Sequence, residues 1–149
     1  MPKIPPPVLA VSLALLMWTL SRFTPPAWPP ATAITAVALL LAVTGTVIDV
    51  SAKRLFVRVG TTINPVTPGA ASCMVREGVY RWTRNPMYLG RTMQLTAMAI
   101  YLASWVGVLG VLMFAIYLDR YQILREGRAL EARFASEFRA YKASVRRWI

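Results

Sequence analysis

The stretch Gly78–Gly90, GVYRWTRNPMYLG, marks the point where a polar segment meets a long apolar run. Within thirteen positions it holds three aromatic residues, two arginines and an Asn-Pro pair. The chain then stays apolar from residue 86 to 118, with Arg91 and Gln94 as the strong exceptions. Aromatic and basic residues at the mouth of such a run predict a polar, ligand-facing entrance to a membrane helix.

Apolar runs also occupy much of the rest of this 149-residue chain, whose length is that of one domain. Apolar residues make up 56% of the sequence, and basic residues flank the runs. This pattern predicts an all-α integral membrane protein. Attraction to anionic membrane lipids and control of topology explain the net charge of +11, so no nucleic-acid partner is expected.

Four apolar segments are predicted to cross the membrane. A single helix over the 33 residues 86–118 would be about 50 Å long, well beyond the bilayer, so a turn near Ser104–Gly107 is expected. Prolines at positions 25–30 separate the first two helices, and the second should continue to Val59. The predicted spans are 7–21, 31–48, 86–103 and 105–120, with a cytoplasmic loop at 59–85 and a cytoplasmic amphipathic helix at 125–147.

The distribution of charge predicts the topology. All of the 17 Lys and Arg residues except Arg22 fall on one side of this arrangement. The positive-inside rule makes that side cytoplasmic, with both termini inside, and we expect a prokaryotic inner membrane. Lys3 and the following apolar run are similar to a signal peptide, but a small-x-small cleavage site is missing. An uncleaved first helix is therefore expected.

The inventory of reactive side chains is thin. The sequence has no His, one Cys and six acidic residues. Catalysis by Ser-His-Asp or Cys-His is therefore excluded, and no metal site is expected. Any chemistry must need little proton transfer or must take its reactivity from a cofactor.

The entrance segment supplies the first candidate site residues. Asn85 can cap a helix, and Pro86 suits the first helical position, so a helix should begin here and favour an anionic ligand group. Arg81 and Arg84 reinforce that preference, and the rings of Tyr80, Trp82 and Tyr88 could stack on a ligand. The alternative is an interfacial anchor made of aromatic residues and snorkelling arginines.

Polar residues further along have two interpretations each. Arg91 lies one turn inside its helix and can snorkel, whereas Gln94 favours a hydrogen bond between helices. Asp119 and Arg120 are either a boundary pair or part of a site. Glu126 could accept hydrogen bonds from ribose hydroxyls or could lie on a solvated helix face.

The C-terminal tail has a helical stripe of apolar residues. Its members are Leu130, Phe134, Phe138, Tyr141, Val145 and Trp148, and basic residues complement them. Such a helix either anchors the tail at the membrane surface or forms a lid over a cytoplasmic site.

Two separated motifs resemble one family. The segment Gly78–Gly90 is similar to the G-x-Y-R-x-x-R-H/N-P-M-Y-x-G signature of the isoprenylcysteine carboxyl methyltransferase and phospholipid methyltransferase superfamily. The preceding TTINPVTP resembles that family's lead-in. The later REGRALEARFASEFRAYKASVRRW resembles its E-E-x-x-L-x-x-x-F-G-x-x-Y-x-x-Y tail. Together they cover residues 60–148, about 60% of the chain.

The resemblance implies S-adenosylmethionine as cofactor, held between the entrance segment, the final hairpin and the tail. By motif position the cofactor-binding residues would be Tyr80, Asn85, Pro86, Tyr88, Leu89, Gly90 and Glu126. Three residues depart from the family pattern. Asn85 replaces the commoner His, Gly127 replaces the second Glu of the pair, and Ala135 replaces the usual Gly.

Methyl transfer from an activated sulfonium chiefly requires alignment and exclusion of water, which suits the few available bases. A lipidic or small hydrophobic acceptor is expected, and Arg84 or Arg120 could hold its anionic headgroup at the reaction centre. A carboxylate or thiolate acceptor is slightly favoured over an amine, because an amine must lose a proton. The alternatives are a membrane reductase using NADPH and a non-catalytic lipid-binding relative. The oligomeric state stays open.

Overall fold

The computed structural model describes residues 4–60 and 73–149, and within these residues every regular element is a helix. The prediction of an all-α fold is confirmed. The elements in chain order are α1 (Pro6–Ser21), α2 (Thr32–Val59), the 3₁₀ turn η2 (Gly78–Arg81), α3 (Pro86–Tyr101), α4 (Trp105–Tyr117), the π-helical segment η3 (Leu118–Ile123) and α5 (Leu124–Ser144).

Local signals in the sequence set the ends of several helices. Prolines occupy the first turn of α1 and of α3, where the missing N–H needs no partner. Ser104 caps α4, because its side chain accepts a hydrogen bond from the Gly107 N–H. α2 runs to Val59 as expected and ends at Gly60 in the left-handed conformation, with φ 68°.

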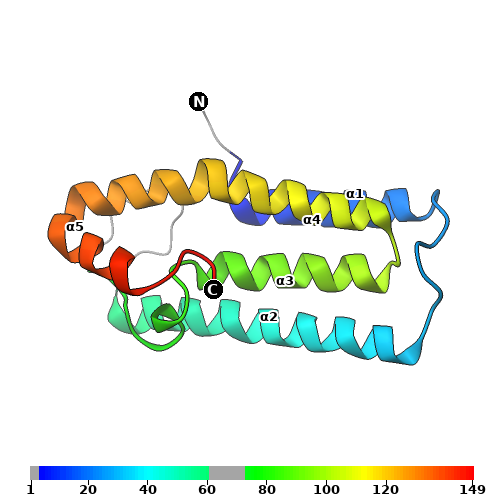
Figure 1. Cartoon of the computed structure of the whole chain (residues 1–149), viewed down its shortest axis with the longest axis horizontal. Helices are drawn as coiled ribbons and strands as arrows, with labels where there is room; N and C mark the ends of the chain where they lie inside the picture. Colours follow the sequence, from blue (N-terminus) through cyan, green and yellow to red (C-terminus); the bar gives the residue numbers. More distant parts are fainter. Residues whose placement is uncertain (1–3, 61–72) are drawn as a thin grey trace.

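The helices run lengthwise through the molecule, with α3 between α2 on one side and α4 with α1 on the other (Figure 1). α5 and the segment after η2 lie at one end, which we call the pocket end. The connections 22–31 and 102–104 lie at the opposite end, which we call the far end.

Small residues bring the helices close together. At the α2–α3 contact, a Cβ added to Gly90 would lie 2.4 Å from the Gly45 carbonyl oxygen. At the α1–α4 contact, a Cβ on Gly110 would lie 2.8 Å from the Met17 sulfur. Close backbone approach of this kind is typical of helix packing in membranes.

The hairpin between α3 and α4 turns at residues 102–104, at the start of the expected turn near Ser104–Gly107. α3 ends at Tyr101, and α4 already begins at Trp105. Ala103 adopts a positive φ of 48°, and its carbonyl accepts a hydrogen bond from the Ala27 N–H. Ser104 ends this turn as the N-cap of α4, and residues 105–107, which were also expected in the turn, form the first turn of that helix.

The apolar helices are exposed rather than buried. Two helical stretches, Thr32–Val59 and the continuous Trp105–Ser144, are long and apolar enough to cross a membrane, and α1 is a shorter apolar helix. Only 17% of the most apolar window of α2 is buried. A soluble protein would bury such helices, so lipid is the solvent that these surfaces fit. The chain is an integral membrane protein.

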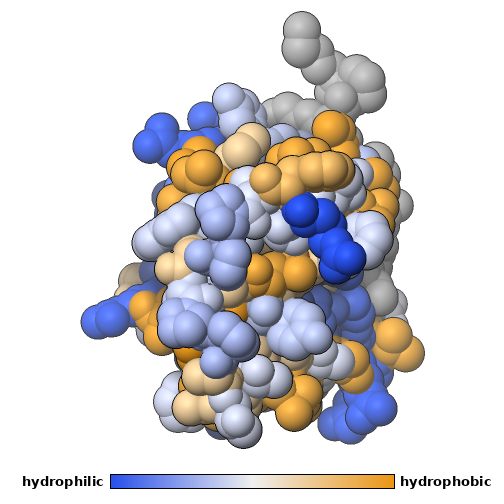
Figure 2. Space-filling view, turned by 90° about the vertical axis from the view of Figure 1, so that its right-hand side faces the viewer, coloured by the Kyte–Doolittle hydropathy of each residue, from blue (hydrophilic) through white to orange (hydrophobic). Residues whose placement is uncertain are grey.

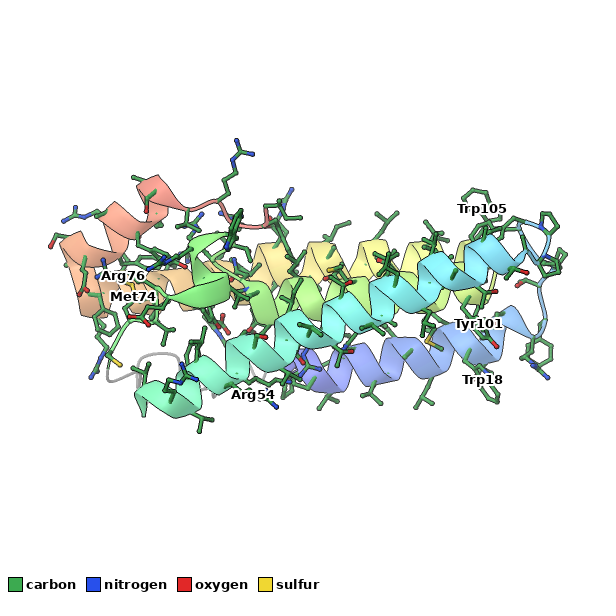
Figure 3. The ribbon with its side chains drawn as sticks, turned by 90° about the horizontal axis from the view of Figure 1, so that it is seen from below. Trp18, Arg54, Met74, Arg76, Tyr101 and Trp105 are labelled. Atoms are coloured by element: carbon green, nitrogen blue, oxygen red, sulfur yellow. The ribbon has the colours of Figure 1, made fainter. Side chains whose placement is uncertain are left out.

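The two ends differ in chemistry. Trp18, Tyr101 and Trp105 gather at the far end, whereas Arg54, Met74 and Arg76 lie at the pocket end (Figure 3). Viewed onto the far end, most of the surface is apolar or weakly polar (Figure 2). Trp28 packs edge-on against Trp105 there, with ring centroids 6.0 Å apart. This is the arrangement of an aromatic belt at a membrane interface.

Candidate functional site

A cavity of about 390 Å³ lies at the pocket end, bounded by α2, the entrance segment and the arch of η3 and α5. Its volume falls in the usual range for small-molecule sites. Apolar side chains form much of the wall, and several titratable groups face it. The polar and charged side chains that line it include Tyr80, Arg84, Asn85, Tyr88, Glu126, Arg128, Glu131, Tyr141, Lys142 and Arg147.

A hydrogen-bonded trio joins the two predicted halves of the site. The Tyr88 hydroxyl in the first turn of α3 donates to Glu126 Oε1 of α5 at 2.5 Å. Gln122 Nε2 donates to the same oxygen at 2.6 Å. Glu126 lies beyond the apolar stretch of its helix, and burial raises the pKa of its carboxyl group. The solvated-face interpretation of Glu126 is therefore wrong.

Tyr80 lies at the base of the cavity and is only 7% exposed. Its ring packs against Phe56 at 5.5 Å, and its carbonyl accepts a hydrogen bond from the Tyr141 hydroxyl at 2.7 Å. Burial raises the pKa of the Tyr80 hydroxyl well above its usual value and that of Tyr141 to about 12. Both phenols therefore stay neutral near neutral pH.

Asn85 occupies the N-cap position of α3, but its side chain does not cap the helix. Its Nδ2 instead donates to the Arg147 carbonyl at 2.8 Å. The Arg84 N–H donates to the Arg146 carbonyl at 3.0 Å. The predicted capping role of Asn85 is wrong, because the C-terminal tail offers its amide a carbonyl on another segment.

The C-terminal tail returns to the entrance segment because α5 kinks. Ala135 adopts φ 37° and ψ −106° inside the helix, which splits the predicted stripe into two differently directed halves. The helix ends at Ser144, short of the expected residue 147. Beyond it, Arg147 pairs with Asp119 at 2.8 Å, so Asp119 is a tether for the tail.

Arg84 lies on the cavity wall with a buried Nε that has no hydrogen-bond partner in the described part of the chain. Burial lowers the pKa of its guanidinium, and the nearby charge of Arg147 lowers it further. A cation in this position is suited to an anionic ligand group.

Three predicted site residues do not line the cavity. Leu89 is on α3 but is not part of the cavity wall, and Gly90 packs against the backbone of α2. Arg120 is exposed. Trp82, whose ring was expected to stack on a ligand, is also outside the cavity and is 81% exposed. The lead-in motif TTINPVTP lies outside the described residues.

Sequence reasoning missed several residues of the cavity. Gln122, which donates to Glu126 from outside the cavity wall, belongs to neither motif and was also missed. Phe56, Met74 and Met87 looked like ordinary apolar residues. Phe138 and Tyr141, in contrast, belong to the apolar stripe of the tail, and their place on the cavity wall fits the interpretation of the tail as a lid.

This architecture defines a small all-α membrane protein with a pocket at one end, whose apolar wall carries several charged and polar groups. The chain belongs to the phospholipid methyltransferase family, whose model matches residues 33–137, more than two thirds of its length. It is also similar to a protein of Haemophilus influenzae described as an uncharacterized protein. The two are 40% identical over 63 residues, which is 42% of this chain and all of that protein. No solved structure matches the chain significantly.

Proposed function

We propose that this protein transfers a methyl group from S-adenosylmethionine to a lipidic acceptor at the cytoplasmic face of the membrane. Membership of the phospholipid methyltransferase family supports methyltransferase activity in general. The main support for S-adenosylmethionine as cofactor is the hydrogen bond from Tyr88 to Glu126. This bond joins the two family motifs around one cavity.

The residues present fit the cofactor. The buried Arg84 Nε suits the carboxylate of its methionine part, and Glu126 suits an amine or ribose hydroxyls. Apolar side chains on the same wall, including Val75 and Phe138, suit an adenine ring. When bound, the cofactor supplies an activated methyl group, and the protein's task is to orient the acceptor and exclude water.

The cavity also bears on the choice of methyl acceptor. An amine acceptor must lose a proton, and the sequence alone indicates no base that could take it. Glu126 lies on the cavity wall, and burial raises the pKa of its carboxyl group, so it could accept a proton from an amine bound in the cavity. The proposed function therefore includes amine acceptors beside carboxylates and thiolates.

Cofactor binding tests the proposal. Isothermal titration of the detergent-solubilised protein with S-adenosylhomocysteine should give a saturable signal. Glu126→Gln and Tyr88→Phe should each weaken it by about tenfold or more, roughly 1.4 kcal/mol, because each removes a partner from the trio. The matched control is Glu137→Gln, since Glu137 is on α5 but pairs with Arg76 outside the cavity.

Folded protein that does not bind S-adenosylhomocysteine would sink the proposal. Protection against unfolding by NADPH in that case would favour the reductase alternative. Mass spectrometry of a total lipid extract incubated with protein and S-adenosylmethionine should show lipids heavier by one CH₂ group. Cofactor binding without any such product would point to the non-catalytic alternative.

A further inference from the structure

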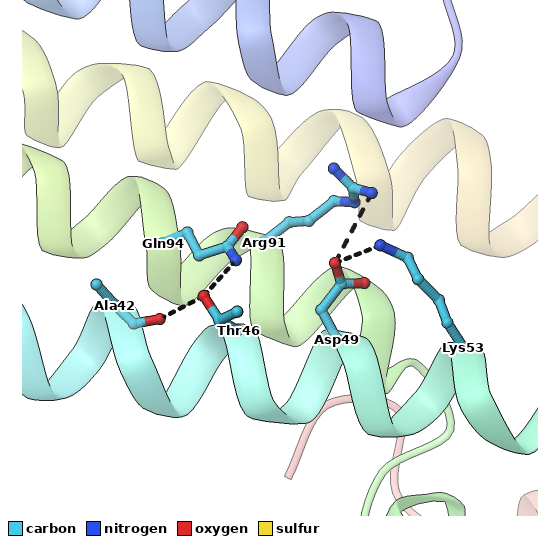
Figure 4. Close-up of polar contacts among 6 residues, drawn as sticks. All are labelled: Ala42, Thr46, Asp49, Lys53, Arg91 and Gln94. Carbon is cyan, nitrogen blue, oxygen red and sulfur yellow. Dashed lines mark hydrogen bonds and ion pairs between the residues drawn. The ribbon is translucent and has the colours of Figure 1, made fainter.

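The α2–α3 contact carries a cluster of three ionisable side chains that do not line the cavity (Figure 4). Lys53 Nζ lies 2.5 Å from Asp49 Oδ2, and an Arg91 guanidinium nitrogen lies 3.9 Å from the same oxygen. Asp49 is only 6% exposed. Its other oxygen, Oδ1, is buried without a hydrogen-bond partner among the described residues.

A second polar contact one turn deeper is built differently. Gln94 Nε2 donates to Thr46 Oγ1 at 2.9 Å, and Thr46 Oγ1 donates to the Ala42 carbonyl at 2.8 Å (Figure 4). Only the Gln94–Thr46 bond crosses between the helices, because Ala42 lies on α2 like Thr46. Together with the close approach of Gly45 and Gly90, it joins α2 to α3 without any ionisable group.

The cluster lies where the apolar part of α2 ends. The apolar run of this helix stops at Ile48, and Asp49 is its first ionisable residue. Gly90 contacts Asp49, which sets Arg91 at the same level on α3. A run of 18 residues spans about 27 Å, close to the hydrocarbon thickness, so this level corresponds to the lipid headgroups.

The charges of the cluster do not balance. Two cations share one carboxylate, which leaves an excess of one positive charge between the helices. The Lys53 side chain is 38% exposed and that of Arg91 is 20% exposed, so both can be reached from outside. Basic groups between helices at this depth attract the phosphates of membrane lipids.

We propose that Arg91 and Lys53 bind the phosphate of a membrane phospholipid, with Asp49 holding the two cations in position. Tyr88, which lines the cavity, lies three residues before Arg91 on α3, about 4.5 Å along the helix toward the pocket end. If the proposed methyl transfer is correct, a lipid held here would have its headgroup directed at the cavity.

Native mass spectrometry of the purified full chain in detergent tests the binding. Its three probes are dioctanoyl phosphatidylglycerol, dioctanoylglycerol and inorganic phosphate. The phosphatidylglycerol should bind, whereas the lipid without phosphate and the free phosphate should bind at least about tenfold more weakly. Equal binding of dioctanoylglycerol would overturn the proposal, and equal binding of free phosphate would make the cluster a site for soluble anions.

Charge variants assign the site to residues. Arg91→Gln and Lys53→Gln should each weaken phosphatidylglycerol binding by about tenfold, and Lys53→Arg should restore most of it. Arg58→Gln is the matched control, because Arg58 is an exposed cation of the same helix outside the cluster. An equal loss in the control would show that the attraction is nonspecific and would overturn the assignment. If Arg91→Gln fails to fold, the loss of phosphatidylglycerol binding in Lys53→Gln still tests the assignment.

S-adenosylhomocysteine binding, measured on the same samples, separates this proposal from the methyltransferase proposal. Wild-type protein that binds the lipid but no S-adenosylhomocysteine would refute only the methyl transfer. The opposite result would refute only the phosphate site. Each variant should keep wild-type S-adenosylhomocysteine affinity, because the cluster lies outside the cavity.

Discussion

Single residues decide how this chain closes its pocket. Asn85 stands where the family more commonly has His, and its amide holds the backbone of the C-terminal tail. Ala135 stands where the family usually has Gly, and it adopts φ 37° in the middle of α5. Residues with a side chain rarely adopt that backbone, so the kink is strained here and its geometry explains the family's glycine.

Replacing Ala135 with Gly should therefore stabilise the protein. Removing the methyl group relieves an unfavourable backbone conformation, worth about 1 kcal/mol after the greater flexibility of Gly in the unfolded chain is subtracted. Thermal unfolding in detergent measures the change. The control is Ala140→Gly, at an exposed helical position where Gly should destabilise by about 1 kcal/mol. A loss of stability in Ala135→Gly would mean that the kink is not strained.

At the scale of elements, the contact between α2 and α3 is the most extensive in the molecule and depends on Gly45 and Gly90. Gly90 belongs to the family signature, and the resemblance placed it in the cofactor site. In the structure it has a packing role, because any side chain there would collide with the α2 backbone.

Gly90→Ala should lower the free energy of unfolding by about 1–3 kcal/mol, since its Cβ would meet backbone atoms that cannot move aside. Gly127→Ala is the matched control, because a Cβ there meets nothing closer than 4.0 Å. Thermal unfolding of both variants gives the comparison. Equal stability of the two would show that α2 and α3 separate easily.

Most elements could be predicted because their signals are local. Pro86 starts α3, Pro6 starts α1, and the apolar run from residue 31 forms α2. A turn near Ser104 was expected from the length of the apolar run, whereas the kink at Ala135 could not be predicted, because the tail that it redirects is held by Asp119 and Asn85, which are distant in sequence. The same holds for the site. Tyr88 and Glu126 belong to motifs, and only the fold brings them together, whereas Gln122 lies outside both motifs, one turn before Glu126 on the same helical stretch.

At the scale of the whole molecule, the topology remains a prediction that labelling can decide. Thr24→Cys and Ser136→Cys, each in a Cys73→Ser chain, put one thiol at the far end or on α5, both at exposed positions. In intact cells a membrane-impermeant maleimide should label only position 24, because the basic pocket end stays inside. Labelling of position 136 alone would reverse the orientation.

Helix α4 continues beyond its apolar part into η3 and α5. From Trp105 through the π segment to Phe134, just before the kink at Ala135, it runs for 30 residues or about 45 Å, roughly one and a half times the hydrocarbon thickness. Its first part is fixed by lipid, and its second part forms the outer wall of the cavity. The two parts should therefore move together, so that a thinner or thicker bilayer that tilts α4 also shifts the cavity wall. We therefore expect the thickness of the bilayer to affect the pocket. The affinity for S-adenosylhomocysteine, measured in lipid vesicles, should vary with the acyl-chain length of the lipids.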